Sequence, residues 1–173
     1  MLATLADPPL TGSSLVFEPK YDGVRAPIAG APARPRPTVR SWSRLGNVKP
    51  TQLPSIVSAL AAFGATVGEP LVVDGEIVAL DAKGNPVGFQ RLQGRIHLSD
   101  AKDVERIDRE HPVAFIAFDL LREGNDDLRG LPLVERRKHL ERRFGKSTSR
   151  TIRISEQTVN DGRALHARAT EEG

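Results

Sequence analysis

The stretch Val113–Leu121 constrains the fold more than any other part of the chain, because nearly all of its residues are apolar. A short run of this kind is typical of a strand that is covered on both faces, in the middle of a sheet. A second stretch, 71–81, predicts another mostly buried strand, although Asp74, Gly75 and Glu76 interrupt its apolar character. The predicted strands and helices are mixed without strict alternation, so we expect an α+β fold rather than a doubly wound one.

Local patterns predict the remaining elements. Further strands are expected over 15–20 and 38–43, and helices over 54–63, 89–96, 103–109 and 133–144. The helix over 133–144 is expected to face inward with Leu133, Leu140 and Phe144. Asp161 is expected to cap a final helix that runs to the end of the chain. Prolines crowd residues 26–37 and predict an exposed, irregular connection there.

The composition is typical of a single cytosolic domain. A chain of 173 residues can bury one core of ordinary size. It contains no cysteine, which excludes disulfides, thiolate metal sites and cysteine nucleophiles. No apolar run is long enough to span a bilayer, and the N-terminus lacks the pattern of a signal peptide. We therefore expect a cytoplasmic protein with no membrane partner.

Positive charge gathers in two regions of the chain. Residues 121–153 contain ten basic and five acidic residues, and a second basic group consists of Arg34, Arg36, Arg40 and Arg44. Such regions attract a phosphate-rich partner. Solvated faces of an arginine-rich protein explain them equally well, so charge alone does not establish nucleic-acid binding.

The hexapeptide 20–25, Lys-Tyr-Asp-Gly-Val-Arg, brings a lysine, an Asp-Gly turn and an arginine together. The Lys20 amine can attack a phosphorus atom, the turn can present it, and Arg25 can hold a nucleotide. An amine attacks only after losing its proton, and neighbouring positive charge and partial burial favour that loss. A surface lysine beside a turn is the simpler explanation of a lone Lys-x-Asp-Gly. The longer string from Glu18 to Arg25 favours the catalytic interpretation.

Three further segments are candidates for a site. In Asp74-Gly75-Glu76 one carboxylate can accept a hydrogen bond from a ribose hydroxyl or approach a metal; alternatively, Gly75 forms a β-bulge and both carboxylates face solvent. Phe118, at the end of the apolar strand, can stack on a purine, although a core position is the commoner use of phenylalanine. Arg44, in a Ser-Arg-Leu-Gly turn, can bind phosphate or be an ordinary loop arginine.

The order of the motifs is more specific than any one of them. The chain contains, in sequence, Lys-Tyr-Asp-Gly-Val-Arg, Ser-Arg-x-Gly, Asp-Gly-Glu-Ile-Val-Ala-Leu-Asp, Phe-Gln-x-Leu-Gln-x-Arg and Phe-Asp-Leu-Leu. This series resembles bacterial ATP-dependent DNA ligases of the end-joining type, over nearly the whole chain. The resemblance implies an α+β nucleotidyltransferase (ATP-grasp-like) adenylation fold, with antiparallel sheets flanked by helices. Residues 1–173 are then expected to be part of one adenylation domain.

The resemblance also implies roles for the candidate residues around the nucleotide. Lys20 would carry AMP after attacking ATP, and Asp22 would support the lysine. Glu18 would lie near the adenine amino group, Glu76 would bind the ribose, and Phe118 would stack on adenine.

On the DNA side, the resemblance implies that Arg25 contacts the ribose or the nick end and that Arg44 binds the DNA 5′-phosphate. The expected substrates are ATP and nicked or broken double-stranded DNA, with Mg or Mn as a divalent metal whose ligands are unknown. The reaction would form lysyl-AMP, transfer AMP to the 5′-phosphate and seal the nick, as in DNA repair and recombination.

The chain also departs from the family pattern. The family's later glutamate motif, its pair of phosphate-binding lysines and its OB-fold domain have no counterpart before residue 173. We therefore expect a C-terminally incomplete domain, whether a natural fragment, a split gene or a recombinant piece, with impaired activity unless a second chain supplies the missing motifs. The alternatives are an inactive nucleotide- or DNA-binding remnant of a ligase and, less favoured, an RNA ligase or an mRNA-capping nucleotidyltransferase.

Overall fold

The computed structural model of the chain describes residues 9–31, 38–41, 50–145 and 149–172. Contacts divide the chain into two compact units. The larger one, here the sheet unit, spans Tyr21–Ile154, and the smaller one, here the terminal unit, joins residues 1–20 to residues 155–173.

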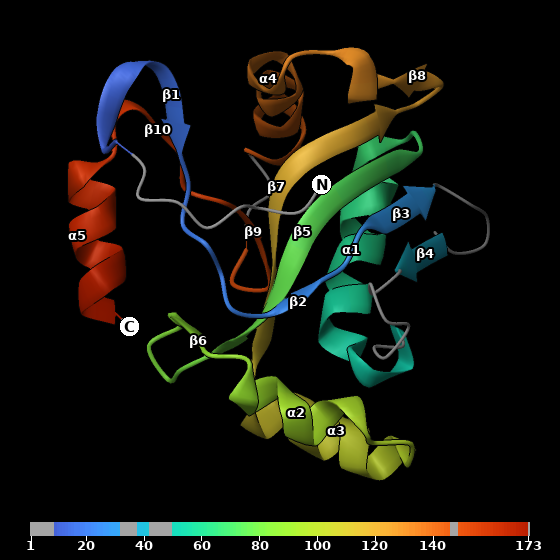
Figure 1. The fold of residues 1–173 in the computed structure, drawn as a ribbon. Coiled ribbons are helices and arrows are strands. Elements are labelled where there is room, and N and C mark those ends of the chain that lie inside the picture. Colours follow the sequence, from blue (N-terminus) through green and yellow to red (C-terminus); the bar gives the residue numbers. More distant parts are fainter. Residues whose placement is uncertain (1–8, 32–37, 42–49, 146–148, 173) are drawn as a thin grey trace. The chain divides into compact units, whose positions relative to one another are not determined.

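The sheet unit is built around two long strands, β5 (Leu71–Leu80) and β7 (Val113–Glu123) (Figure 1). They pair antiparallel from Leu71 opposite Glu123 to Ala79 opposite Val113. Six shorter strands complete an eight-stranded sheet in the described residues: β2 (Val24–Arg25), β3 (Ile28–Ala31), β4 (Thr38–Ser41), β6 (Pro86–Val87), β8 (Asp126–Asp127) and β9 (Ile152–Ile154).

The pairing of the short strands places them around this central pair. The order across the sheet is β4-β3-β5-β7-β8, while β2 and β6 also pair with β5, and β9 pairs with β7. Within the described residues every pair is antiparallel except β7–β9, which is parallel.

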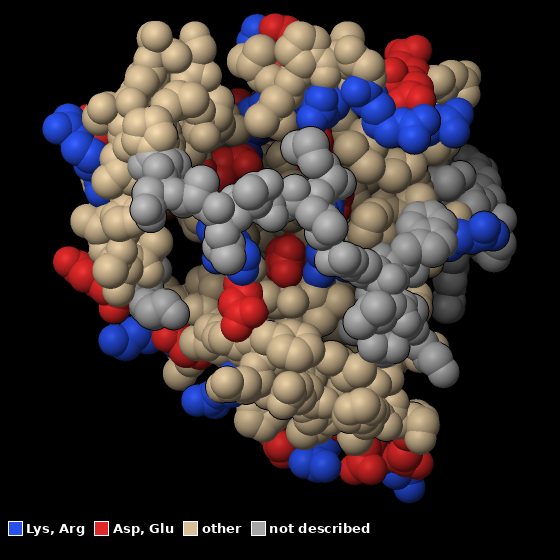
Figure 2. Space-filling view, in the orientation of Figure 1, with Lys and Arg blue, Asp and Glu red and all other residues tan. Residues whose placement is uncertain are grey.

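Four helices belong to the sheet unit as described: α1 (Pro54–Val67), α2 (Gln90–Ile96), α3 (Ala101–Glu110) and α4 (Leu133–Phe144), with 3-10 turns at Pro50–Gln52 and Leu128–Gly130. A proline in the first turn of α1 costs no helical hydrogen bond, and Gly68 ends the helix in the left-handed conformation. Acidic and basic side chains lie side by side over the lower edge of the molecule, where Figure 1 shows α3 (Figure 2).

The main core lies between one face of the sheet and helices α1 and α4. Phe63 of α1 and Phe144 of α4 have ring centroids 4.2 Å apart, and Phe115 of β7 is fully buried in the same cluster. Burying each of these rings stabilises the fold by roughly 1.5–3 kcal/mol. The opposite face carries a smaller cluster of Val78, Leu80, Ala114 and Ile116, against which Tyr21 packs.

The terminal unit pairs the two ends of the chain. Its strand β1 (Thr11–Phe17) runs antiparallel to β10 (Thr158–Asp161), and helix α5 (Arg163–Glu172) follows. The Asp161 carboxylate accepts a hydrogen bond from the amide of Arg163 at 3.1 Å, and the Arg163 guanidinium beside it lowers the pKa of Asp161 to about 2. Asp161 is the last residue of β10, and its side chain accepts from the first amide of α5, so the predicted cap of the final helix is found.

Most of the predicted elements are confirmed, with three corrections. The predicted connection over 26–37 contains strand β3, and Ala26 and Ile28 are buried in the core. The first strand lies earlier than predicted and ends at Phe17, because it pairs with β10. Leu133 is 39% exposed, so only Leu140 and Phe144 of the three predicted residues face inward from α4.

Candidate active site

The turn that follows Tyr21 is fixed by two contacts. The Asp22 carboxylate accepts a hydrogen bond from the Phe89 amide at 3.0 Å, at the start of α2. Gly23 lies against β5, and a Cβ there would stand 2.2 Å from the carbonyl oxygen of Ile77. Only glycine fits this close approach, so the turn delivers the next two residues to β5 in one register.

Arg25 is held in that register by a buried carboxylate. It lies opposite Glu76 in the β2–β5 pair. Its guanidinium donates two hydrogen bonds to Asp74, from Nη2 at 2.6 Å and from Nε at 3.2 Å. The Asp74 side chain is 7% exposed and is therefore buried, whereas the Arg25 side chain is 45% exposed and reaches the surface.

The electrostatic surroundings of Arg25 are acidic. The hydrogen bond to Asp74 raises the pKa of Arg25, burial acts against it, and the charges of Asp74, Glu76 and Asp119 add to the increase. The guanidinium carbon also lies 5.7 Å from the centre of the Phe118 ring, within the range of a cation–π contact. Arg25, Glu76 and Phe118, three residues predicted from the sequence, therefore lie together.

Phe118 owes its position to an irregularity in the central pair. Asp74 lies opposite Asp119 and Gly75 lies opposite Ala117, so Phe118 is an extra residue in β7. Such a bulge redirects a side chain out of the regular alternation of a strand. One interpretation of the sequence placed a β-bulge at Gly75. This interpretation is wrong, because the extra residue is Phe118 on the partner strand β7.

Gly75 and Asp74 differ from that interpretation in two other ways. A Cβ on Gly75 would stand 2.4 Å from Cζ of Phe115, so the glycine makes room for a core ring. Asp74 is 5% exposed and paired with Arg25, and does not face solvent. Glu76 is half-buried.

A second ion pair, which the sequence analysis did not assign, supports the bulge from α4. Arg136 donates to both Asp119 carboxylate oxygens at 2.8 Å and to the Leu131 carbonyl at 2.6 Å. Both side chains of the pair are largely buried, and the hydrogen bond to Asp119 raises the pKa of Arg136. Asp119 belongs to the Phe-Asp-Leu-Leu motif and Arg136 to the helix predicted over 133–144, but no local pattern pairs them.

Two other predicted residues belong to the terminal unit. Glu18 is exposed and accepts a hydrogen bond from Gln157 at 3.2 Å. Lys20 is exposed, so the partial burial that the sequence analysis invoked for it is not found. Arg44 lies outside the described residues.

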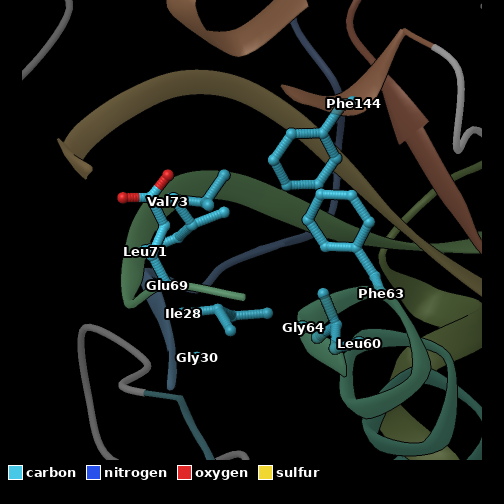
Figure 3. Close-up of a pocket in the computed structure, with 9 residues that line it drawn as sticks. All are labelled: Ile28, Gly30, Leu60, Phe63, Gly64, Glu69, Leu71, Val73 and Phe144. Atoms are coloured by element: carbon cyan, nitrogen blue, oxygen red, sulfur yellow. The ribbon is translucent and has the colours of Figure 1, made fainter. Parts of the chain in front are cut away.

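A shallow apolar pocket lies at the main core (Figure 3). In that view the rings of Phe63 and Phe144 face each other on one side, and the Glu69 carboxylate points away from them. The other lining residues are Ile28, Gly30, Leu60, Gly64, Leu71 and Val73. Because this lining offers no cation for a phosphate, we do not assign a nucleotide to it.

Among the residues that the structure describes, no group of three or more His, Asp or Glu side chains could hold a metal ion. None of the described helices is long and apolar enough to cross a membrane.

Comparison with known proteins identifies the family. The family model described as "ATP dependent DNA ligase domain" matches residues 1–171. The chain belongs to this family. A probable DNA ligase of Streptomyces coelicolor is 36% identical over 125 residues, which are 72% of this chain and 23% of that protein. DNA ligase C of Mycobacterium tuberculosis is 37% identical over 124 residues, which are 72% of this chain and 32% of that protein.

Solved structures agree with the adenylation fold. The ligase domain of M. tuberculosis LigD superposes with a TM-score of 0.67 at 27% identity, covering 95% of this chain and 46% of that one. A mycobacterial DNA ligase D complexed with ATP and MES gives a TM-score of 0.65 at 28% identity, covering 95% and 48%. The α+β nucleotidyltransferase fold predicted from the sequence is confirmed. The chain spans less than a third of the two curated relatives and about half of these structures.

Proposed function

We propose that this chain carries the nucleotide-accepting chemistry of an ATP-dependent DNA ligase, and that residues 1–173 are part of its adenylation domain. In the first step the Lys20 amine, after losing a proton, attacks the α-phosphate of ATP. A nitrogen–phosphorus bond forms, the bond between the α- and β-phosphates breaks, and pyrophosphate leaves. The product is a lysyl-AMP.

The arrangement of Arg25 carries this proposal. Five residues after Lys20 in the sequence, Arg25 is fixed by the buried Asp74 and lies over the Phe118 ring. A cation beside an aromatic ring suits a nucleotide, because the cation attracts phosphate and the ring stacks on a base. The guanidinium occupies one face of the ring, and we assign adenine to the other.

The remaining nucleotide contacts are assigned by the family resemblance. We propose that Glu76 binds the ribose and that Glu18 lies near the adenine amino group. Asp22 supports the lysine indirectly, since its carboxylate ties the turn after Lys20 to the start of α2. Asp22 is thus a positioning residue in this proposal.

The later steps involve DNA. We propose that AMP passes from Lys20 to a DNA 5′-phosphate and that a 3′-hydroxyl then displaces it, with Arg44 on the 5′-phosphate and Arg25 on the ribose or the nick end. The substrate would be nicked or broken duplex DNA in the cytoplasm, in repair or recombination. We further propose a second chain, which supplies the missing family motifs, as a partner.

A divalent ion, Mg or Mn, is expected to accompany ATP. Within the described part of the chain, no group of three or more His, Asp or Glu side chains could hold this ion, and we assign it no ligand.

Self-adenylylation tests the proposal. The chain is incubated with α-labelled ATP or GTP and Mg²⁺, denatured, and examined for covalent label. We expect label from ATP, little from GTP, and none in Lys20→Arg, which keeps the charge but presents a different nitrogen group. Equal labelling from GTP would favour a capping-type enzyme, and labelling that survives Lys20→Arg would refute the assignment of the nucleophile.

A further inference from the structure

Two arginines, Arg150 just before β9 and Arg153 within it, are anchored by main-chain carbonyls. Arg150 Nη2 donates to the carbonyl of Ala82 at 3.3 Å. Arg153 donates from Nη1 to the carbonyl of Gly84 at 2.8 Å and from Nε to that of Arg150 at 3.1 Å. These carbonyls belong to the β5–β6 turn and to the segment entering β9, so both guanidiniums are attached to backbone at the central strands.

The two guanidiniums border the same small space. A Cβ built on Gly84 would stand 3.5 Å from Nη2 of Arg153 and 3.7 Å from Nε of Arg150. Gly84 has a φ of 92°, in the left-handed region that favours glycine. The turn therefore places no side chain between the two cations.

Neither guanidinium pairs with a carboxylate of the residues that the structure describes, in contrast to Arg25, Arg95 and Arg136, each of which pairs with an aspartate. The carboxylate of the same turn, Asp81, accepts hydrogen bonds from the main chain and the side chain of Asn85 instead. Two like charges fixed side by side repel each other, and an anion between them would offset that repulsion.

The titration of Arg153 agrees with this geometry. Burial lowers the pKa of Arg153, the neighbouring Arg150 charge lowers it further, and Tyr21 acts in the opposite direction. An arginine nevertheless stays charged near neutral pH. The pair is therefore a fixed double positive charge.

We propose that Arg150 and Arg153 form a phosphate-binding site. Guanidinium groups suit this ligand because their planar N–H donors match phosphate oxygens. The phosphate belongs either to the DNA backbone or to the polyphosphate chain of a nucleotide. These two ligands are chosen because of the function proposed above, whereas the phosphate site itself is inferred from the two arginines. The chemistry assigned to Lys20 uses neither arginine.

The test compares Arg150→Gln, Arg153→Gln and the double variant with wild type in two binding assays. One measures the affinity for a short unnicked DNA duplex at several salt concentrations. The other measures the rise in thermal midpoint produced by inorganic tripolyphosphate. The matched control is Arg106→Gln, because Arg106 carries the same charge but is already paired with Asp103 and Glu110 at 3.1 and 3.2 Å.

If DNA is the source, the double variant should lower the slope of log affinity against log salt by about one to two, since each phosphate contact contributes about 0.9. If a nucleotide is the source, the stabilisation by tripolyphosphate should disappear instead. Either loss, absent in Arg106→Gln, supports the site. The proposal is overturned if both measurements match the control, or if wild type responds to neither ligand.

Folding is checked separately. Arg150→Gln removes one long hydrogen bond and one repulsive charge, so its thermal midpoint should equal or exceed that of wild type. If the double variant does not fold, two single variants are compared with wild type instead. These are Arg150→Gln and Arg153→Lys, and the lysine in the second keeps the charge but loses the planar donors. Lys20→Arg should lose the covalent adduct and keep phosphate binding, so the two proposals can fail independently.

Discussion

Replacing Asp74 by asparagine should both destabilise the fold and release Arg25. The substitution keeps the shape of the side chain but removes the charge that accepts two hydrogen bonds from the guanidinium. An asparagine can accept only at one oxygen, so the bidentate contact is lost. The register between β2 and β5 remains, while the group that fixes the cation over Phe118 does not.

The magnitude follows from the exposure of the two partners. Removing one member of a fully buried ion pair costs about 3–5 kcal/mol, whereas an exposed pair contributes about 0.2–1 kcal/mol. Asp74 is 7% exposed at its side chain but Arg25 is 45% exposed, so Arg25 can regain water once released. We therefore expect a loss of about 1–2 kcal/mol, which lowers the midpoint of a domain of this size by about 2–8 °C.

Thermal unfolding followed by circular dichroism measures this loss. The matched control is Asp127→Asn, because Asp127 also binds one arginine, Arg129, through both oxygens but at the surface. Its midpoint should stay near that of wild type. Asp74→Asn should also weaken adduct formation from ATP. An Asp74→Asn chain that unfolds at the wild-type temperature would refute the reasoning, since the pair would then contribute nothing.

Two further predictions concern ion pairs between α4 and β7. Arg136→Lys keeps the charge of Arg136 but loses its bidentate contact to Asp119. The ATP concentration for half-maximal adduct formation should therefore rise about fivefold, with a smaller change in the maximal rate. A change in the maximal rate alone would contradict a positioning role for Arg136. Burial raises the pKa of Glu123, but hydrogen bonds from His139 and Arg143 and the charges of Arg143 and Arg142 more than offset it, so the pKa is lowered. Wild type should therefore lose stability as the pH falls below about 4.3 and through that lowered pKa. Glu123→Gln should be less stable at neutral pH and should lose less stability than wild type between pH 7 and pH 3, because only the carboxylates with lowered pKa values that remain, such as Asp161, contribute to its loss. Urea unfolding at pH 7, 4 and 3 measures both.

Elements set by local pattern could be predicted from the sequence. The helix over 133–144 was predicted with its observed bounds, because the apolar periodicity and the flanking residues that define it lie within or beside the segment itself. The two central strands were predicted because each is apolar on both faces. Strand β3 was missed, because prolines dominate the local signal and only pairing with β4 and β5 makes the segment a strand.

In the candidate active site, too, contacts between distant segments could not be predicted from local sequence pattern. The motif indicated Arg25 as a nucleotide contact, but its partner Asp74 lies 49 residues away and is selected by strand register. The bulge at Phe118 depends on how β7 pairs with β5. The contact between Asp119 and Arg136 depends on how α4 packs against β7. None of these contacts is visible in the periodicity of one segment.

The most direct test of the central claim is to locate the nucleotide on the chain. Wild type is incubated with ATP and Mg²⁺, kept at alkaline pH because a nitrogen–phosphorus bond is hydrolysed by acid, digested, and analysed by mass spectrometry. The account predicts one AMP group on the peptide that contains Lys20. AMP on another lysine, or no AMP on a chain shown to be folded by circular dichroism, would contradict it.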